Sequence, residues 1–570
     1  MQPYGEAESI AIHDAGAEST RPLARLRNRD LFNIITVILG WGLLLLLIPP
    51  EHDYPIVDDW IYAGSVRNLL ETGTFTLPTH SQASLVGLTY WGAAWSKLFG
   101  FSFTTLTYST LVMALAGLLA FYGIARAVNV PPWGALLGTA LLAFNPIFLH
   151  FSYSFMTDVP FLALVLIACY LYTKGVQGGG VGWFLLGSLF VSWAILIRQF
   201  GVLVPVPFLF YLALEGLIKK KWRWWHMVSA VLLPAVVGGA WYIWLRSPPT
   251  GFAAAAAERS ASIIFHEPWL RVFLVRTFTI LPLLALFAWT AVKMRRAIWQ
   301  FTLPLALVLI WCMYAVDLPN ENLNQMYEPP FTARLGPFSF DHPQEMWTFG
   351  VWGNTIRVTG LDFFEYNQER IWTPEAWRAL WALGAALAVV LLAKIGDGLL
   401  DWYREVRQGT PLSPHLPLYL LGACIFVASL AFPGDLFDRY ILGFLPFVIL
   451  FMVRGSAQWG RVAWAYSIGA LVLIALFATL AKSDQIDHDN ARWEAGRWMQ
   501  ARVGSVYVGF DWNYWVGSSS DSYQVADLPL EGFRTEQSFP YTCRLCGGTT
   551  RLVLAQSRIT MPPLPAPPAP

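Results

Sequence analysis

Long runs of apolar residues constrain the fold of this chain more than any other feature of its sequence. A helix needs roughly 17 to 25 predominantly apolar residues to cross the hydrocarbon core of a bilayer. We predict about thirteen such spans, near 31–48, 104–125, 132–149, 159–174, 182–198, 200–217, 227–245, 272–292, 299–316, 375–393, 416–432, 440–453 and 462–481. Of the 570 residues, only 13% are charged, against roughly a quarter in a soluble chain. The sequence therefore predicts an α-helical, multi-pass integral membrane protein.

The basic residues set the expected orientation of these spans. Four arginines at positions 21–29 precede the first span, so the N-terminal tail 1–30 is predicted to be cytoplasmic. Further along, the basic run 219–223 falls in a loop that the alternation of spans also places in the cytoplasm. The long loops are then predicted to lie on the outer side of the membrane, at 49–103, 247–271 and 318–374. A bacterial inner (plasma) membrane is the expected location.

The end of the chain differs from the rest. The membrane domain is predicted to cover 31–481, and an odd number of spans leaves residues 482–561 outside the cytoplasm. Apolar alternation at 505–510 is typical of a strand, so this part is predicted to be a small α/β or α+β domain. The tail 562–570 is rich in proline and is expected to be disordered.

Ionisable residues near the membrane boundary are expected to gather at the outer face. Two adjacent carboxylates, Asp58 and Asp59, follow the first span, and Asp158 and Arg198 lie at later boundaries on the same predicted side. Charges at a hydrocarbon boundary are costly, which favours a shared cavity for a charged ligand. Two alternatives stay open: a solvated loop start at the acidic pair, and a structural ion pair between Asp158 and Arg198.

These residues carry a resemblance to a known family. The stretch from Asp58-Asp59 through Tyr62, the motif Thr157-Asp158-Val159-Pro160, and Asp438-Arg439-Tyr440 are the matching elements. In them the chain resembles the C-type membrane glycosyltransferases that use polyprenyl-phosphate sugars, above all the protein O-mannosyltransferase and lipid A aminoarabinose transferase branch. The resemblance implies their fold and a transfer of the sugar, with inversion, to a glycan, lipid or protein hydroxyl. It also implies that Asp58 is the general base.

Binding roles follow from the same resemblance. Arg198 and Arg439 are expected to hold the donor phosphate, because the planar guanidinium matches phosphate oxygens. Many relatives have a lysine before the Tyr-Trp pair of the first outer loop, whereas this chain has none in 86–91. Arg67, His80 or Arg198 would have to replace it.

The other expected substrate contacts are less specific. Asp59 and Asp158 could orient the base, bind sugar hydroxyls or pair with an arginine. Tyr62 and Tyr440 could contact the sugar, with anchoring at the membrane interface as the alternative.

No cofactor is expected. The sequence has no paired-histidine helix or EF-hand-like run, so we favour a reaction without metal, with a divalent ion at Asp58 and Asp59 as the open alternative. Cys543 and Cys546 have half of a zinc-ribbon spacing without the second half, and they are expected to form a local disulfide rather than to act in redox catalysis. The expected partners are the lipid-linked donor, the acceptor and membrane lipids, without nucleic acid. A flippase for lipid-linked sugars and a non-catalytic envelope assembly subunit are the alternative functions.

Overall fold

The computed structural model describes residues 20–56, 59–78, 83–246, 403, 407, 413–430, 442–508, 512, 515–526, 529, 530, 532–544 and 548–561. The helices of the first half are α1 (Thr20–Leu47), α2 (Asp59–Thr72), α3 (Val86–Phe99), α4 (Phe103–Ala127), α5 (Pro132–Ala143), α6 (Pro146–Ser152), α7 (Asp158–Val176), α8 (Val181–Ile197), η1 (Gln199–Leu203), α9 (Pro205–Lys219) and α10 (Trp224–Arg246). The later elements are α18 (Leu416–Leu430), α19 (Leu445–Val453), η4 (Arg454–Gln458), α20 (Arg461–Val503), β1 (Tyr523–Ala526), β2 (Phe533–Cys543) and β3 (Thr549–Arg558).

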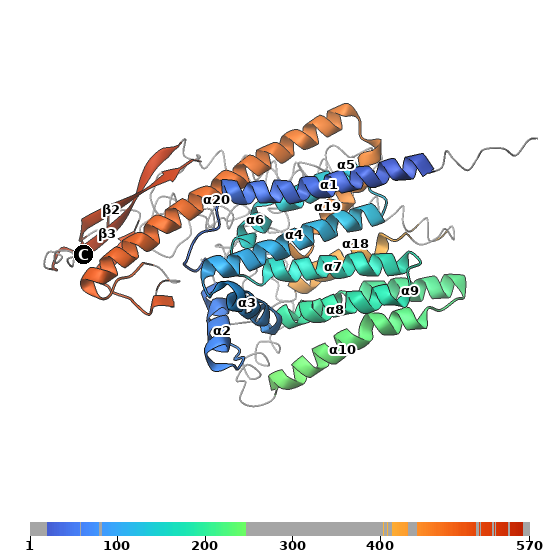
Figure 1. Cartoon of the computed structure of the whole chain (residues 1–570), viewed down its shortest axis with the longest axis horizontal. Coiled ribbons are helices and arrows are strands. Elements are labelled where there is room, and N and C mark those ends of the chain that lie inside the picture. Colours follow the sequence, from blue (N-terminus) through green and yellow to red (C-terminus); the bar gives the residue numbers. More distant parts are fainter. Residues whose placement is uncertain are drawn as a thin grey trace, which may run out of the picture.

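The long helices lie side by side as a bundle, and α20 leaves it to reach a small β-sheet (Figure 1). We call the end of the bundle where α1 ends and α2 and α3 lie the sheet end, because the sheet is on that side. The chain enters α1 at the opposite end. Helices α4 and α7 begin at the sheet end and α8 finishes there, so residues far apart in the sequence meet at it.

Six helices in the described part of the chain are long and apolar enough to cross a membrane, or seven if the bent pair α5 and α6 is one span. The chain is an integral membrane protein. The predicted spans 272–292, 299–316 and 375–393 lie outside the described residues, as do the predicted outer loops 247–271 and 318–374. The count of about thirteen therefore stays a prediction.

The span predicted at 132–149 is not one straight helix. Helices α5 and α6 meet at a bend of 63°. Pro146 opens α6, and the Asn145 side chain accepts hydrogen bonds from the backbone N–H of Ile147 (3.1 Å) and Phe148 (3.2 Å). Proline lacks the N–H that would continue α5, and asparagine satisfies the first free N–H groups of a new helix. Apolar composition predicted the span, while the Asn-Pro pair breaks it.

The helices pack closely where small residues face one another. A Cβ placed on Gly117 of α4 would lie 3.0 Å from the Cα of Ala163 on α7, so a larger residue would push the two helices slightly apart. Close backbone contact is the usual way in which membrane helices associate, since lipid is as apolar as their side chains. The predicted outer loop 49–103 contains α2 and α3, which cover the sheet end of the bundle.

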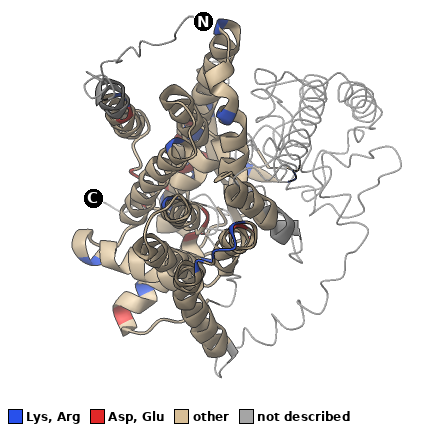
Figure 2. Ribbon diagram, turned by 90° about the vertical axis from the view of Figure 1, so that its right-hand side faces the viewer, with Lys and Arg blue, Asp and Glu red and all other residues tan. Residues whose placement is uncertain are grey.

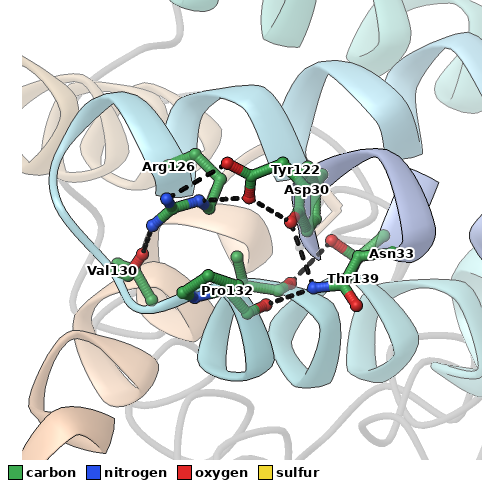
Figure 3. Close-up of polar contacts among 8 residues, drawn as sticks. Asp30, Asn33, Tyr122, Arg126, Val130, Pro132 and Thr139 are labelled. Carbon is green, nitrogen blue, oxygen red and sulfur yellow. Dashed lines mark hydrogen bonds and ion pairs between the residues drawn. The ribbon is translucent and has the colours of Figure 1, made fainter. Parts of the chain in front are cut away.

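A polar network joins α1 to α4 and α5 at the end away from the sheet (Figure 3). Arg126 forms an ion pair with Asp30 at 2.6 Å, and the Tyr122 hydroxyl donates to the same carboxylate at 2.7 Å. Asn33 donates its amide to the carbonyl of Pro132 at 2.9 Å. The network fixes the first helix against its neighbours through partly buried groups.

Much of the helix surface is suited to lipid. Seen from the end away from the sheet, most of the ribbon carries no charged residue (Figure 2). In the most apolar windows of α1, α10 and α20, only 17%, 22% and 11% of the residues are buried inside the protein. Exposed leucines such as Leu39 and Leu473 would be unfavourable in water and are expected to contact acyl chains.

The 43-residue helix α20 connects the bundle to the sheet. At 1.5 Å per residue it is roughly 65 Å long, about twice the hydrocarbon thickness of a bilayer, so its polar second half must project from the membrane. The predicted domain boundary at 481/482 falls inside this continuous helix. The sheet has strand order β1-β3-β2 with antiparallel neighbours, and one face packs on α20. Within the predicted strand 505–510, Tyr507 makes an isolated bridge to Gln524.

Candidate functional site

Asp59 is the first residue of α2 and is completely buried. One carboxylate oxygen accepts the backbone N–H of Ile56 at 2.7 Å, and the other accepts that of Phe155 at 3.3 Å. The first bond has the spacing of a capping box, in which a side chain reaches back three residues to the backbone. Both oxygens therefore hold the chain in place, which favours the interpretation of Asp59 as an orienting carboxylate.

Asp158 and Arg198 form a buried ion pair at the same end of the bundle. Asp158 opens α7, and Arg198 follows the last residue of α8 in extended conformation. The guanidinium Nη2 lies 3.0 Å from the Asp158 carboxylate, and Nε donates to the Thr157 hydroxyl at 2.6 Å. The side chains are 1% and 12% exposed, respectively, so the arginine is the partner with access to a ligand. This is the structural ion pair that the sequence left as an alternative to ligand binding.

The ion pair leaves acceptor capacity on Asp158. Among the described residues, neither of its buried carboxylate oxygens accepts a hydrogen bond of good geometry, although Nη2 of Arg198 lies 3.0 Å from Oδ1. A carboxylate has room for several donors, and buried polar groups in folded proteins normally find them. The charge of Asp158 is compensated, but its lone pairs remain available to a donor such as a hydroxyl.

One short segment links the two acidic positions. The Phe155 N–H binds Asp59, and three residues later Asp158 begins α7. The Phe155 ring packs so tightly on α3 that a Cβ on Gly92 would lie 2.5 Å from its Cζ. Tertiary packing thus brings Asp158 together with Asp59, the described residue of the Asp58-Asp59 pair, which we call the acidic motif.

The loop between α1 and α2 is anchored on α4. The imidazole of His52 lies 3.4 Å from the Thr107 hydroxyl, and Asp53 accepts the backbone N–H of Phe103 at 3.0 Å. Burial, together with the nearby charge of Lys482, lowers the pKa of His52 to about 3. His52 is therefore neutral at physiological pH and cannot supply a cation to a phosphate.

The same loop is anchored on α20. Tyr54 stacks on Trp493 with ring centroids 5.5 Å apart, and its hydroxyl donates to the carbonyl of Ile486 at 3.3 Å. Arg497 donates to the carbonyl of Asp53 at 3.2 Å. Tyr54 belongs to the apolar cluster that also holds the sheet on α20. The backbone leading to the acidic pair is thus clamped between the bundle and the C-terminal region.

The remaining predicted site residues divide into two groups. Tyr62 lies on α2 and is buried in the main apolar core. The exposed Arg67 places its guanidinium over the rings of Trp515 (4.0 Å) and Phe101 (5.3 Å), so it contacts the C-terminal region. Four predicted residues lie outside the described residues: Asp58, His80, Arg439 and Tyr440.

Sequence reasoning missed a buried polar cluster beside the acidic motif. Lys482 is 1% exposed and donates to Gln485 at 2.9 Å, with His150 of α6 3.4 Å away. In the sequence, the only sign of this cluster is a lysine directly after an apolar run. That pattern is equally typical of an ordinary membrane boundary. Only the packing of α20 against α6 shows that it is interior.

The described residues contain no group of three or more His, Cys, Asp or Glu side chains placed to hold a metal ion. Cys169 and Cys424 are free thiols. Cys543 is disulfide-bonded, whereas Cys546 lies outside the described residues.

Comparison with solved structures finds several membrane glycosyltransferases. ArnT from Cupriavidus metallidurans, bound to undecaprenyl phosphate, is 14% identical over 93% of this chain and 98% of its own, with a TM-score of 0.36. The archaeal oligosaccharyltransferase AglB from Archaeoglobus fulgidus, in complex with an inhibitory peptide and a dolichol-phosphate, is 14% identical over 82% of this chain and 58% of its own, with a TM-score of 0.43. Arabinosyltransferase EmbB from Mycobacterium smegmatis is 12% identical over 93% and 48%, with a TM-score of 0.32. Scores below 0.5 carry no argument for a shared mechanism.

The sequence comparison is more specific. No curated protein matches the chain. Residues 87–244 match the family described as dolichyl-phosphate-mannose-protein mannosyltransferase. The matched stretch runs from α3 to α10 and includes the ion pair of Asp158 and Arg198, but ends short of Asp58 and Asp59 on the N-terminal side. This family match confirms, over residues 87–244, the chain's resemblance to the polyprenyl-phosphate-sugar-dependent membrane glycosyltransferases.

Proposed function

We propose that this protein transfers a sugar from a polyprenyl-phosphate donor to an acceptor hydroxyl at the sheet end of the bundle. The observation that carries the proposal is the buried pair of Asp158 and Arg198, 3.0 Å apart within the stretch that matches the mannosyltransferase family. It is joined through Phe155 to Asp59 of the acidic motif. A cation and carboxylates thus meet where a lipid-linked donor could enter from the membrane.

The reaction needs a base for the acceptor. As the acceptor oxygen forms its bond to the anomeric carbon, the bond from that carbon to the phosphate oxygen breaks, and a carboxylate takes the hydroxyl proton. Asp59 is poorly suited to this task because both its oxygens bind backbone amides. We assign the base to its sequence neighbour Asp58, and a single displacement of this kind inverts the anomeric configuration.

The leaving group is polyprenyl phosphate, whose negative charge increases as the glycosidic bond breaks. Arg198 is suited to stabilise this charge, since its side chain is partly accessible and a guanidinium binds phosphate oxygens in pairs. Arg439 is the second candidate from the sequence. Asp158 keeps Arg198 oriented, and its remaining acceptor capacity suits a sugar hydroxyl.

The side of the membrane and the acceptor are part of the proposal. The basic residues before α1 favour an orientation with the sheet end outside the cytoplasm, and the acceptor would then be a glycan, a lipid or a protein hydroxyl of the cell envelope. The proposed reaction needs no metal, because arginines alone can neutralise the negative charge of a monophosphate.

The direct test uses the purified full chain in nanodiscs with radiolabelled undecaprenyl-phosphate mannose and an extract of envelope acceptors. We expect label to move from lipid to acceptor, and D58N to abolish the transfer. Mass spectrometry of envelope glycans, with and without the protein, would identify the natural product. If the wild-type protein instead moves the intact donor between leaflets of a vesicle without releasing polyprenyl phosphate, the flippase alternative replaces the proposal.

A further inference from the structure

We propose that Lys482 is a positioning residue that holds the acidic motif in its working conformation, acting through Tyr153, Phe155 and Asp59. The kinetic part of this inference rests on the proposed function. The structural part does not, since it concerns only how α20 supports the sheet end of the bundle.

Lys482 is an unusual interior residue. Its side chain is 1% exposed, and among the described residues no carboxylate forms an ion pair with it. The ammonium donates to Gln485 at 2.9 Å and lies 3.4 Å from Nδ1 of His150. Lysine is almost never fully buried without compensation, because the charge loses its hydration. Such a position calls for a reason other than packing.

The lysine touches the segment that carries the acidic contact. Its ammonium lies over the ring of Tyr153, 5.4 Å from the centroid, and the Tyr153 hydroxyl donates to the carbonyl of Ile48 at 2.9 Å. Two residues beyond Tyr153, the Phe155 N–H binds Asp59. Lys482 and Asp59 thus contact the same short segment, residues 153–155. This segment is held by the end of α1, by α2 and by α20.

The surrounding charges fit this role. The titratable groups around Lys482 are His52 from the loop after α1, Asp59 from α2, His150 and Tyr153 from α6 and its end, and Asp489 from α20. His52 is neutral, so it adds no charge. Burial lowers the pKa of the Lys482 ammonium, and the charges of Asp489 and Asp59 oppose this shift. Attraction between buried charges is weakly screened, so the cation favours Asp59 as an ionised acceptor for its two backbone amides.

The consequence is a link between α20 and Asp58. Without the cation, the bonds from Asp59 to Ile56 and Phe155 should weaken, so Ile56 and Asp59, the described residues that flank Asp58, should be held less firmly. Lys482 itself has no access to the donor. Its loss should therefore reduce the rate of transfer more than the affinity for the donor.

Hydrogen exchange of the full chain in detergent tests the structural part without any substrate. In K482M, which keeps the length of the side chain but not its charge, we expect the Ile56 and Phe155 amides to lose protection by about tenfold or more. K482R should retain most of it. K482Q keeps a donor for Gln485 and serves if the methionine variant does not fold. R126M, which removes a cation at the opposite end of the bundle, is the matched control and should leave both amides protected.

Kinetics of the same variants test the consequence. We expect kcat of K482M to fall about tenfold with a KM for undecaprenyl-phosphate mannose close to that of the wild type, and K482R to recover most of the rate. Well-folded K482M and K482Q with unchanged protection at Ile56 and Phe155 would overturn the inference, even where the wild type transfers sugar. Loss of protection in a protein that shows no transfer in any form would support the positioning role and reject the proposed function instead.

Discussion

The acidic pair should respond to substitution in two opposite ways. Asp58→Asn removes the proposed base while keeping nearly the same shape, so we expect the transfer rate to fall at least about a hundredfold with little change in the free energy of unfolding. Asp59→Asn should do the reverse: a clear loss of stability with a milder loss of rate.

The magnitude for Asp59 follows from its contacts. The carboxylate accepts two buried backbone N–H groups, at 2.7 Å from Ile56 and 3.3 Å from Phe155. In Asp59→Asn one oxygen becomes an NH₂ group that faces one of these donors. A hydrogen bond to a charged group contributes roughly 1.5–3 kcal/mol, and a buried donor left without an acceptor costs roughly 1–3 kcal/mol. Since these terms overlap, we expect a loss of about 2–4 kcal/mol in the free energy of unfolding.

Two measurements on each detergent-purified variant check the prediction. Titration with SDS gives the change in the free energy of unfolding, and release of undecaprenyl phosphate from the labelled donor gives the rate. Asp59→Ala, which frees both amides, should be less stable than Asp59→Asn. A stable Asp59→Asn protein whose rate falls more than that of Asp58→Asn would show that the two roles are exchanged and refute the reasoning from the backbone contacts.

Four further predictions concern the rest of the site. Arg198→Lys keeps the charge but loses the paired geometry of the guanidinium, so kcat should fall while stability stays nearly unchanged. Arg198→Ala should lower kcat further. Unchanged kinetics in both folded variants would show that this residue does not bind the phosphate. Because His52 is held neutral, with a pKa of about 3 in the folded chain against an ordinary 6.5, the unfolded state binds the proton first and stability should fall as pH drops from about 6.5 towards 3. The loss should be about 2 kcal/mol between pH 7 and pH 5, and unfolding curves of H52Q should be less sensitive over that range. Cysteines introduced near Asp53 and Ser522 should react with an impermeant thiol reagent in intact cells, whereas one near Gly178 should react only after lysis; the opposite pattern would invert the topology. EDTA should leave the transfer rate unchanged, and restoration by Mg²⁺ or Mn²⁺ after its loss would establish a metal at the acidic pair.

Much of the architecture follows from local sequence. Apolar runs as long as a bilayer is thick predict the membrane helices. The break between α5 and α6 was also readable, because Asn145-Pro146 is a start signal for a new helix. The prediction of one span rested on the length of the apolar run alone.

The candidate site also has some features that follow from local sequence and others that depend on tertiary packing. The sequence by itself determined that the chain is a membrane protein and that Asp158 and Arg198 lie at the ends of membrane helices, since length and hydropathy are local properties. Only the tertiary structure decided that Asp158 pairs with Arg198, that both oxygens of Asp59 are engaged, and that Lys482 is interior. Apart from the local bond between Asp59 and Ile56, these contacts join residues from 40 to several hundred positions apart. Whether a charge is solvated or buried depends on which helix packs over it. Helix packing in a membrane is set by close fit rather than by an apolar pattern, so no periodicity along the chain records it.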